Sequence, residues 1–456
     1  MITRLFLAML LLSFGSRAEL PAVPARIPAD VRARFELAPF YEKHVLVGGL
    51  PIVGSARCSD AALREAAWII RRMLAERDDL LAAMAANRVR LAVMAATEYT
   101  TDIPEHSKLS PRVYWDRRAR GLGATVANPC VSCAEENLLS FPGDPYREEN
   151  ILIHEFAHAI HETGLSKTDP TFDARLRRAY KQATGKGLWK GSYAAVNHME
   201  YWAEGVQCWF DDNRENDALH NHVNTRAELR AYDPGLAALC KEVLGDGAWR
   251  YVRPAQRPAA DRAHLADFDF AKAPRFHWRP EPIPDKPRVG IHTEHGEILV
   301  ELDYKAAPQT VANFLHYAHR GFYNDGRFFQ SVTEENQPGD AGKIAMIQAE
   351  ADARQAEHFP EPIPLERTSD TGLRHLDGTI SMASEGPNSA QHTFFICVGD
   401  QPTLDFDGAP RPDRQGFAAF GRVIKGMEIV RKIHALPSEA QQLQPPVRIQ
   451  RVIRLN

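Results

Sequence analysis

Two histidines four residues apart, with a glutamate directly after the first, form the segment of this chain best suited to chemistry. The segment is His154-Glu155-Phe156-Ala157-His158. Residues four apart share one face of a helix, so the two imidazoles can point at one Zn²⁺ while Glu155 lies beside them. Such an ion acidifies the water that it binds, and a neighbouring carboxylate accepts the proton. The pattern therefore predicts the hydrolytic centre of a zinc peptidase.

A site with two histidines needs a third protein ligand. Glu200 and Glu204 are also four residues apart, and the residues between them are apolar, which predicts a second buried helix. One of these carboxylates would bind the ion, and the other would accept a hydrogen bond from a ligand histidine. The alternative is that both are solvated groups on a helix. His161, three residues beyond His158, is expected to be a polar helix residue near the site and not a ligand.

The run from Glu200 to Glu204, with the sequence Glu-Tyr-Trp-Ala-Glu, resembles the glutamate helix of the Glu-liganded zincins. Within them it is most similar to the anthrax lethal factor and Pro-Pro endopeptidase group, over about residues 149–210. The resemblance implies that Glu200 is the third zinc ligand and that Glu204 supports a ligand histidine. It also implies that Tyr193 stabilises the oxyanion, that Glu155 is general base and then acid, and that an edge strand pairs with the substrate.

Length and composition bound the other possibilities. At 456 residues the chain is too long for one ordinary core, which favours two or three domains. A net charge of −4 gives no indication of nucleic-acid binding. Residues 1–18 combine Arg4, a short apolar run and a small-residue cleavage site, which predicts a signal peptide and no membrane anchor after its removal. We therefore expect a periplasmic or secreted protein.

Six cysteines follow this segment. In an oxidising compartment, the five of the first domain are expected to form up to two structural disulfides of open connectivity. Cys130 and Cys133 have the spacing of a local bridge, a redox pair or half of a zinc site. Cys397 lies in an apolar run and is expected to be a buried free thiol.

A proline-dense segment divides the chain. Residues 253–287 hold seven prolines and are expected to form a semi-extended linker. Residues 19–252 before it predict an α+β zincin-like domain with a strand at 88–96. Residues 288–456 after it are rich in strands and predict a closed antiparallel barrel. The predicted helices are 59–76, 149–163, 171–184 and 198–212 in the first domain, and 308–320 and 426–434 in the second.

Short motifs identify the second domain more sharply than the strand pattern does. In order, they are residues 307–314 (APQTVANF), 321–323 (GFY), 346–348 (MIQ), 378–383 (GTISMA), 394–396 (FFI) and 420–423 (FGRV). Together they resemble a cyclophilin over nearly the whole domain, which implies an eight-stranded barrel with two helices and a proline pocket on its outer face. The pocket residues that the resemblance implies are Phe329, Met346, Gln348, Ala383, Phe395 and Leu404.

One catalytic position departs from the family pattern. The family run Phe-His-Arg-Val aligns with residues 329–332, so Ser331 is expected to replace the arginine. Rotation about a prolyl amide crosses a barrier of about 18–20 kcal/mol, which a guanidinium donating to the prolyl nitrogen lowers. A serine cannot place a cation there. Ala345 and Thr403 also replace two aromatic pocket residues, so we expect weak isomerase activity or proline binding alone.

Three functions are consistent with these patterns. The favoured one is an exported endopeptidase that holds one Zn²⁺ and whose cyclophilin-like domain presents proline-containing peptide or protein substrates. The second is a peptidyl-prolyl cis-trans isomerase whose zincin-like domain serves for docking. The third is a non-catalytic periplasmic chaperone or binding protein.

Overall fold

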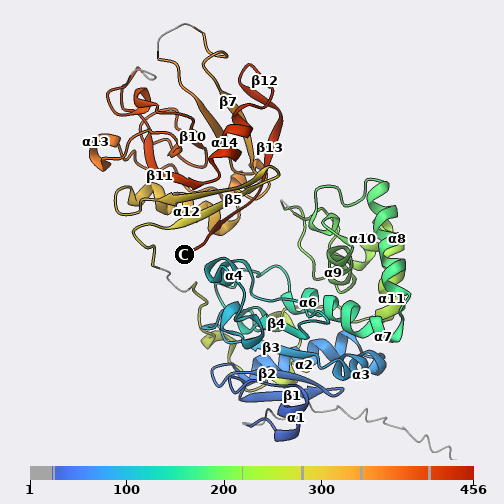
Figure 1. The fold of residues 1–456 in the computed structure, drawn as a ribbon. Coiled ribbons are helices and arrows are strands. Elements are labelled where there is room, and N and C mark those ends of the chain that lie inside the picture. The colour runs from blue at the N-terminus through green and yellow to red at the C-terminus, as the bar shows by residue number, and fades with distance from the viewer. Residues whose placement is uncertain (1–22, 24–25, 218, 279–281, 339–341, 409–411) are drawn as a thin grey trace, which may run out of the picture. The chain divides into compact units, whose positions relative to one another are not determined.

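The chain folds into two compact units, each described here by itself (Figure 1). The structure, a computed structural model, describes residues 23, 26–217, 219–278, 282–338, 342–408 and 412–456. The predicted signal peptide, residues 1–18, lies outside this described part. Unit 1 consists of three segments, which end at Ala96, Arg214 and Phe276; the second and third begin at Gly123 and Val223. Unit 2 consists of Thr97–Leu122, Glu215–His222 and His277–Asn456.

A four-stranded sheet forms the centre of unit 1. Its order is β1-β2-β3-β4, with β1 antiparallel to β2 and the other pairs parallel. The parallel strands are almost wholly buried, as expected for strands covered on both faces. The predicted strand at 88–96 is β3, which lies between two other strands and offers no free edge. The strands are β1 (Lys43–Val47), β2 (Leu50–Gly54), β3 (Arg90–Met94) and β4 (Cys130–Ala134).

Two helices of unit 1 carry the predicted metal ligands. α6 packs against both β4 and α9, and it continues into a π-helical turn at Ile160–Leu165. The side chain of Asn197 caps α9 by accepting from two backbone N–H groups of its first turn. The helices are α1 (Ala29–Arg34), α2 (Asp60–Met73), α3 (Asp78–Ala86), α5 (Glu135–Leu138), α6 (Ile151–Ala159), α7 (Ser166–Thr168), α8 (Phe172–Gly185), α9 (His198–Trp209), α10 (Arg226–Tyr232) and α11 (Pro234–Leu244).

The proline-dense segment is not a linker along its whole length. Residues 253–276 belong to unit 1 and form three short 3₁₀ turns. Arg257 is buried there against Glu65 of α2, with 2.7 Å between Nη2 and Oε1, and His264 reaches the same carboxylate at 2.7 Å. The prolines therefore prevent regular helices without preventing packing.

Unit 2 confirms the predicted eight-stranded antiparallel barrel. The sheet runs β13-β5-β6-β11-β9-β10-β8-β7, and β13 pairs with β7 to close it, while the short β12 adds to β13. The ring of Phe314 on α12 packs inside against Phe394 and Phe420. The strands are β5 (Arg288–Thr293), β6 (Gly296–Leu302), β7 (Arg327–Val332), β8 (Met346–Glu350), β9 (Thr379–Met382), β10 (Phe394–Cys397), β11 (Ala418–Lys425), β12 (Ser438–Glu439) and β13 (Gln442–Arg454).

Helices cover the ends of this barrel. α12 (Pro308–Arg320) and α14 (Met427–His434) correspond to the two predicted helices. The short α13 (Thr368–Thr371) was not predicted. Residues 97–122, predicted to lie in the first domain, belong to unit 2, where α4 (Arg112–Arg118) packs against α12.

The cysteines do not form the disulfides that the sequence favoured. All six are buried, and in the described part of the chain none is joined in a disulfide. Cys130 and Cys133 lie three residues apart on β4, so their side chains leave opposite faces of the strand and cannot bond to each other. Within the described residues, no helix combines the length and the apolar content needed to cross a membrane.

Candidate active sites

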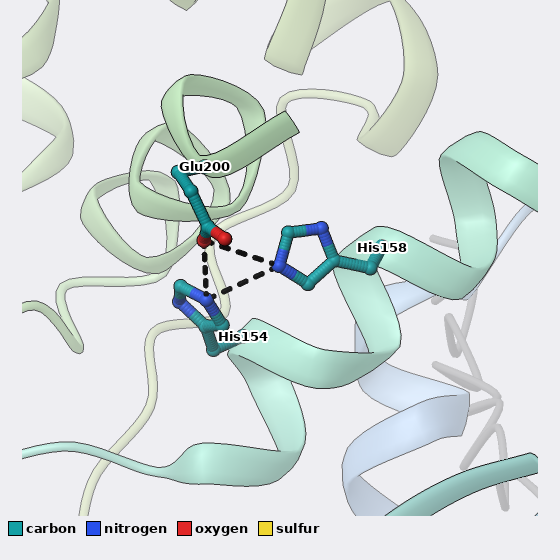
Figure 2. Close-up of side chains that lie close together, drawn as sticks. All are labelled: His154, His158 and Glu200. Carbon is teal, nitrogen blue, oxygen red and sulfur yellow. Dashed lines mark hydrogen bonds and ion pairs between the residues drawn. The ribbon is translucent and has the colours of Figure 1, made fainter. Parts of the chain in front are cut away.

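The helices α6 and α9 bring His154, His158 and Glu200 together in unit 1 (Figure 2). Nε2 of His154 lies 3.2 Å from Nε2 of His158 and 3.2 Å from Oε2 of Glu200, which is 3.3 Å from Nε2 of His158. Ligand atoms around a tetrahedral Zn²⁺, with bonds of about 2.0–2.1 Å, are about 3.3–3.4 Å apart. The three donors therefore have the identity and the spacing that a zinc ion requires.

The electrostatics of the cluster also suit a cation. Burial alone would lower the pKa of His154, but the hydrogen bond with Glu200 and the surrounding carboxylates raise it to about 10. Burial opposes ionisation of Glu200, yet its hydrogen bonds with the two imidazoles bring its pKa well below the usual range. Both shifts favour positive charge on the imidazoles beside an ionised Glu200, the charge pattern that a bound cation would replace.

The residue that forms a hydrogen bond with Nδ1 of His154 is not the one expected from the sequence. Glu204 was expected to accept a hydrogen bond from a ligand histidine, but its Oε1 lies 3.7 Å from Nδ1 of His154, and its Oε2 accepts from Asn213. The close partner is Gln207, whose Oε1 lies 2.7 Å from that Nδ1. Sequence reasoning missed Gln207, although it stands seven residues after Glu200 and so shares its face of α9.

The other predicted residues surround the same cluster. Burial raises the pKa of Glu155, although the two histidines act against this shift. The ring centroid of Tyr193 lies 6.2 Å from that of His154. A Cβ added at Gly123 would lie 3.3 Å from Oε2 of Glu155, so the backbone passes close to this carboxylate. His161 binds Asp173 at 3.1 Å instead of joining the cluster, as expected for a neighbouring polar residue.

A second group of predicted residues lies on the outer side of the barrel in unit 2. Met346, Phe395 and Leu404 belong to one apolar cluster, against which Ala383 packs. The ring of Phe417 stands edge-on to Phe395, with 5.5 Å between centroids. This cluster is separate from the barrel core.

A bulge in β7 changes two assignments made from the sequence. Phe328 pairs with Ala349 and Gln330 pairs with Gln348, so Phe329 is an extra residue between them. Paired residues share a face of the sheet, and one extra residue exchanges the faces. Within the described residues Phe329 is not part of the apolar cluster, and its assignment to the proline pocket is not supported.

The same bulge determines whether Gln330 or Ser331 faces outward. Ser331 pairs with Ile347, a residue of the barrel core, and its hydroxyl donates to the backbone carbonyl of His434. Gln330 lies on the outer face across from Gln348, and its Nε2 donates to Oε1 of Gln441 at 2.9 Å. Gln330 therefore faces outward beside Gln348, and Ser331, which the sequence placed at the arginine position, faces the barrel core.

A buried hydrogen-bonded chain supports this outer face. Nδ1 of His375 lies 2.7 Å from Oδ1 of Asp405, and its Nε2 lies 2.9 Å from the hydroxyl of Ser381. The imidazole stacks on Phe395, with 5.9 Å between centroids. Burial alone would raise the pKa of Asp405, but the hydrogen bonds from His375 lower this pKa below its usual value. Sequence reasoning missed these residues because they are far apart in the chain and their spacing forms no motif.

Comparisons with known proteins concern the same part of the chain. The family model "Cyclophilin type peptidyl-prolyl cis-trans isomerase/CLD" matches residues 288–454. Peptidyl-prolyl cis-trans isomerase B of Escherichia coli (strain K12) is 33% identical over 146 residues, which cover 32% of this chain and 82% of that protein. Peptidyl-prolyl cis-trans isomerase A of Dickeya dadantii (strain 3937) is 38% identical over 155 residues, covering 33% and 73%.

One solved structure was also matched. A cyclophilin type peptidyl-prolyl cis-trans isomerase of Cryptosporidium parvum matches at 21% identity with a TM-score of 0.31, covering 38% of this chain and 98% of that one. The two sequence relatives are matched over most of their own length. By its residues 288–454, the chain belongs to the cyclophilin-type peptidyl-prolyl cis-trans isomerase family.

Proposed function

We propose that this chain binds proline-containing polypeptide segments on the outer face of its barrel and isomerises their prolyl bonds with low turnover. The observation that carries the proposal is the outward row in which Gln330 and Gln348 lie beside Phe395. This row offers an apolar surface for a proline ring and amide groups for the backbone next to it.

Some residues of this site bind the substrate, and others act on the prolyl bond. Met346, Phe395 and Leu404 hold the ring, and Gln348 donates to a substrate carbonyl. Burial of the prolyl bond against apolar side chains disfavours its planar form, which is the more polar one because of its double-bond character. Gln330 offers a neutral donor where a guanidinium would offer a charged one, and this limits the rate.

Peptide binding and isomerisation are measured together to test the proposal. Titration with Ala-Pro peptides followed by NMR is expected to show binding, and exchange between the cis and trans signals is expected to be accelerated. Gln348→Leu keeps the volume of the side chain and removes its amide, so we expect a loss of about tenfold in kcat/KM, the cost of about one hydrogen bond. A wild-type chain that neither binds nor isomerises such peptides refutes the proposal.

A second function is supported by a different observation, the convergence of His154, His158 and Glu200. We propose that unit 1 is a zinc-dependent endopeptidase, in which these three residues hold one Zn²⁺. When bound, the ion supplies Lewis acidity toward the scissile carbonyl and acidifies water. The proposed peptidase does not depend on the barrel. The zincin-like fold of unit 1 stays a prediction.

The chain's own residues supply the remaining steps of this proposed hydrolysis. Glu155 accepts a proton from the attacking water and passes it to the leaving amine, and burial beside the cluster suits its pKa to both roles. Tyr193 lies beside His154, from where a phenol can donate to the oxyanion of the tetrahedral intermediate. A periplasmic or secreted location, with proline-containing substrates, fits this reading.

Substitution of Glu155 separates the candidate functions. Glu155→Gln is expected to abolish peptide cleavage while zinc remains bound and isomerase activity is unchanged. Cleavage retained by this variant refutes the peptidase. Zinc content of Glu200→Ala beside Glu204→Ala tests the ligand assignment, since loss is expected only in the first. If the chain turns over neither substrate but suppresses aggregation of a client protein, the chaperone reading replaces both.

A further inference from the structure

We propose that Gln207 is the residue that orients His154 for metal binding, in place of the carboxylate that the sequence favoured. The inference rests on the metal site proposed above. Gln207 is wholly buried on α9, and its Oε1 lies 2.7 Å from Nδ1 of His154. It is a positioning residue, because it acts through a ligand and does not itself join the three ligand atoms.

The orientation of the Gln207 amide is fixed from its other side. Its Nε2 donates to Oε2 of Glu149 at 3.0 Å, and Oε1 of Glu149 lies 3.5 Å from Nη1 of Arg214. A carboxylate only accepts from an amide, so the NH₂ group must face Glu149. The carbonyl oxygen of Gln207 must then face His154, because a rotated amide would set this oxygen against the carboxylate of Glu149, and both groups are acceptors.

This fixed carbonyl selects one tautomer of the imidazole. Because Oε1 of Gln207 can only accept, Nδ1 of His154 must carry a hydrogen. In the neutral ring the lone pair is then on Nε2, the atom that lies 3.2 Å from both His158 and Glu200. The row Arg214, Glu149, Gln207 and His154 therefore keeps the hydrogen on Nδ1, so that Nε2 is the nitrogen that gives up its proton when a metal binds.

Glu204 is less suited to this task. Its nearer contact to Nδ1 of His154 is 3.7 Å, beyond a hydrogen bond, and its Oε2 accepts from Nδ2 of Asn213 at 3.0 Å. A neutral amide also differs from a carboxylate in its effect. It orients the ring without adding negative charge, so the imidazole donates less electron density to the ion and the ion stays more electrophilic.

Zinc affinity, measured on the full chain by competition with a chromophoric chelator, tests this inference. Gln207→Met keeps the length of the side chain but removes the acceptor, and we expect it to weaken zinc binding by about 10- to 100-fold. Glu204→Gln is the matched control on the same helix, with an expected change below about threefold. The double exchange of Glu149→Gln with Gln207→Glu restores a donor and an acceptor in swapped positions, so it is expected to recover most of the affinity.

The outcomes distinguish the metal site from the role of Gln207. If the wild-type chain binds no zinc, the metal site itself fails. If the wild type binds zinc and Gln207→Met binds it equally well, the site stands and the positioning role is refuted. If the double exchange loses as much affinity as Gln207→Met, packing explains the loss and the inference is overturned. If Glu204→Gln loses more zinc affinity than Gln207→Met, Glu204 and not Gln207 is the residue that orients His154.

Discussion

The substitution Gln330→Arg is expected to convert a slow isomerase into a faster one. Gln330 occupies the outward position of β7 across from Gln348, where the proposed function places a neutral donor beside the prolyl bond. Its Nε2 already donates to Oε1 of Gln441 at 2.9 Å. A guanidinium has five donors, so it can keep the bond to Gln441, which holds it in place, and still donate to a prolyl nitrogen.

The size of the gain follows from the kind of hydrogen bond. A bond from a neutral donor contributes about 0.5–1.5 kcal/mol, and one from a charged donor about 1.5–3 kcal/mol. If the twisted amide of the transition state accepts the stronger bond, the barrier falls by about 1–1.5 kcal/mol. Since each 1.36 kcal/mol is a factor of ten, kcat/KM is expected to rise about 5- to 13-fold.

The test variant and its control differ by one position on β7, and the bulge places these two positions on opposite faces of the sheet. A protease-coupled assay on Ala-Pro peptides, with a chelator present to silence any metal site, measures kcat/KM for Gln330→Arg and Ser331→Arg. Ser331 is wholly buried across from Ile347, so an arginine there would be a charge in the barrel core. We expect Ser331→Arg to gain no activity and to lower the urea midpoint of unit 2, because an unpaired buried charge is costly.

The two variants give opposite results under the two assignments. A gain in Ser331→Arg without one in Gln330→Arg would show that the sequence alignment is right and that the register argument is wrong. No gain in Gln330→Arg, in a protein that still binds the peptide, would refute the view that donor charge at this position limits the rate.

Three further results are expected. Arg257→Ala removes the guanidinium from the buried Glu65 and leaves His264 as its remaining contact among the described residues, so urea denaturation should show unit 1 destabilised by up to about 3–5 kcal/mol. Gly123→Ala places a Cβ 2.8 Å from that of His158, so zinc affinity in the chelator competition should fall by at least about tenfold. Zinc must displace a proton from His154, whose pKa is raised to about 10, so below that pH affinity should rise about tenfold per pH unit, measured at pH 7 and pH 8.

Each of these results has a control in the same unit. Lys272→Ala removes an exposed ion pair with Asp269 and should change the free energy of unfolding by less than about 1 kcal/mol. Gly185→Ala adds a Cβ that meets no atom within 4 Å and should leave zinc affinity unchanged. Equal effects in test and control variants, or zinc affinity that does not vary with pH, would contradict the corresponding argument.

The barrel could be predicted from the sequence because its signals are local and numerous. Helical periodicity placed α12 and α14 within a few residues of where they lie, and the ordered motifs indicated the barrel. The pattern of His154 and His158 likewise depends on a single helix, whose geometry fixes which side chains share a face. Their approach to Glu200 is a contact between helices, for which the sequence offered only a matching residue type.

Register and pairing were beyond the sequence because they depend on a single inserted residue or on distant partners. Nothing local distinguishes Gln330 from Ser331 as the outward residue, since the bulge is defined by β8 and not by β7 alone. Gln207 was missed because an amide is not a metal ligand and becomes informative only beside His154. The disulfide expectation rested on compartment and count, which say nothing about which faces two thiols occupy.

The six buried thiols can report when each unit of this chain unfolds. Each thiol reacts with an alkylating reagent only when the structure around it opens, because burial denies the reagent access. Cys397 is in the barrel unit and the other five are in unit 1, so mass spectrometry of alkylated peptides would time the opening of each unit within one molecule. No probe has to be introduced, since the unmodified chain already carries one set of reporters in each unit.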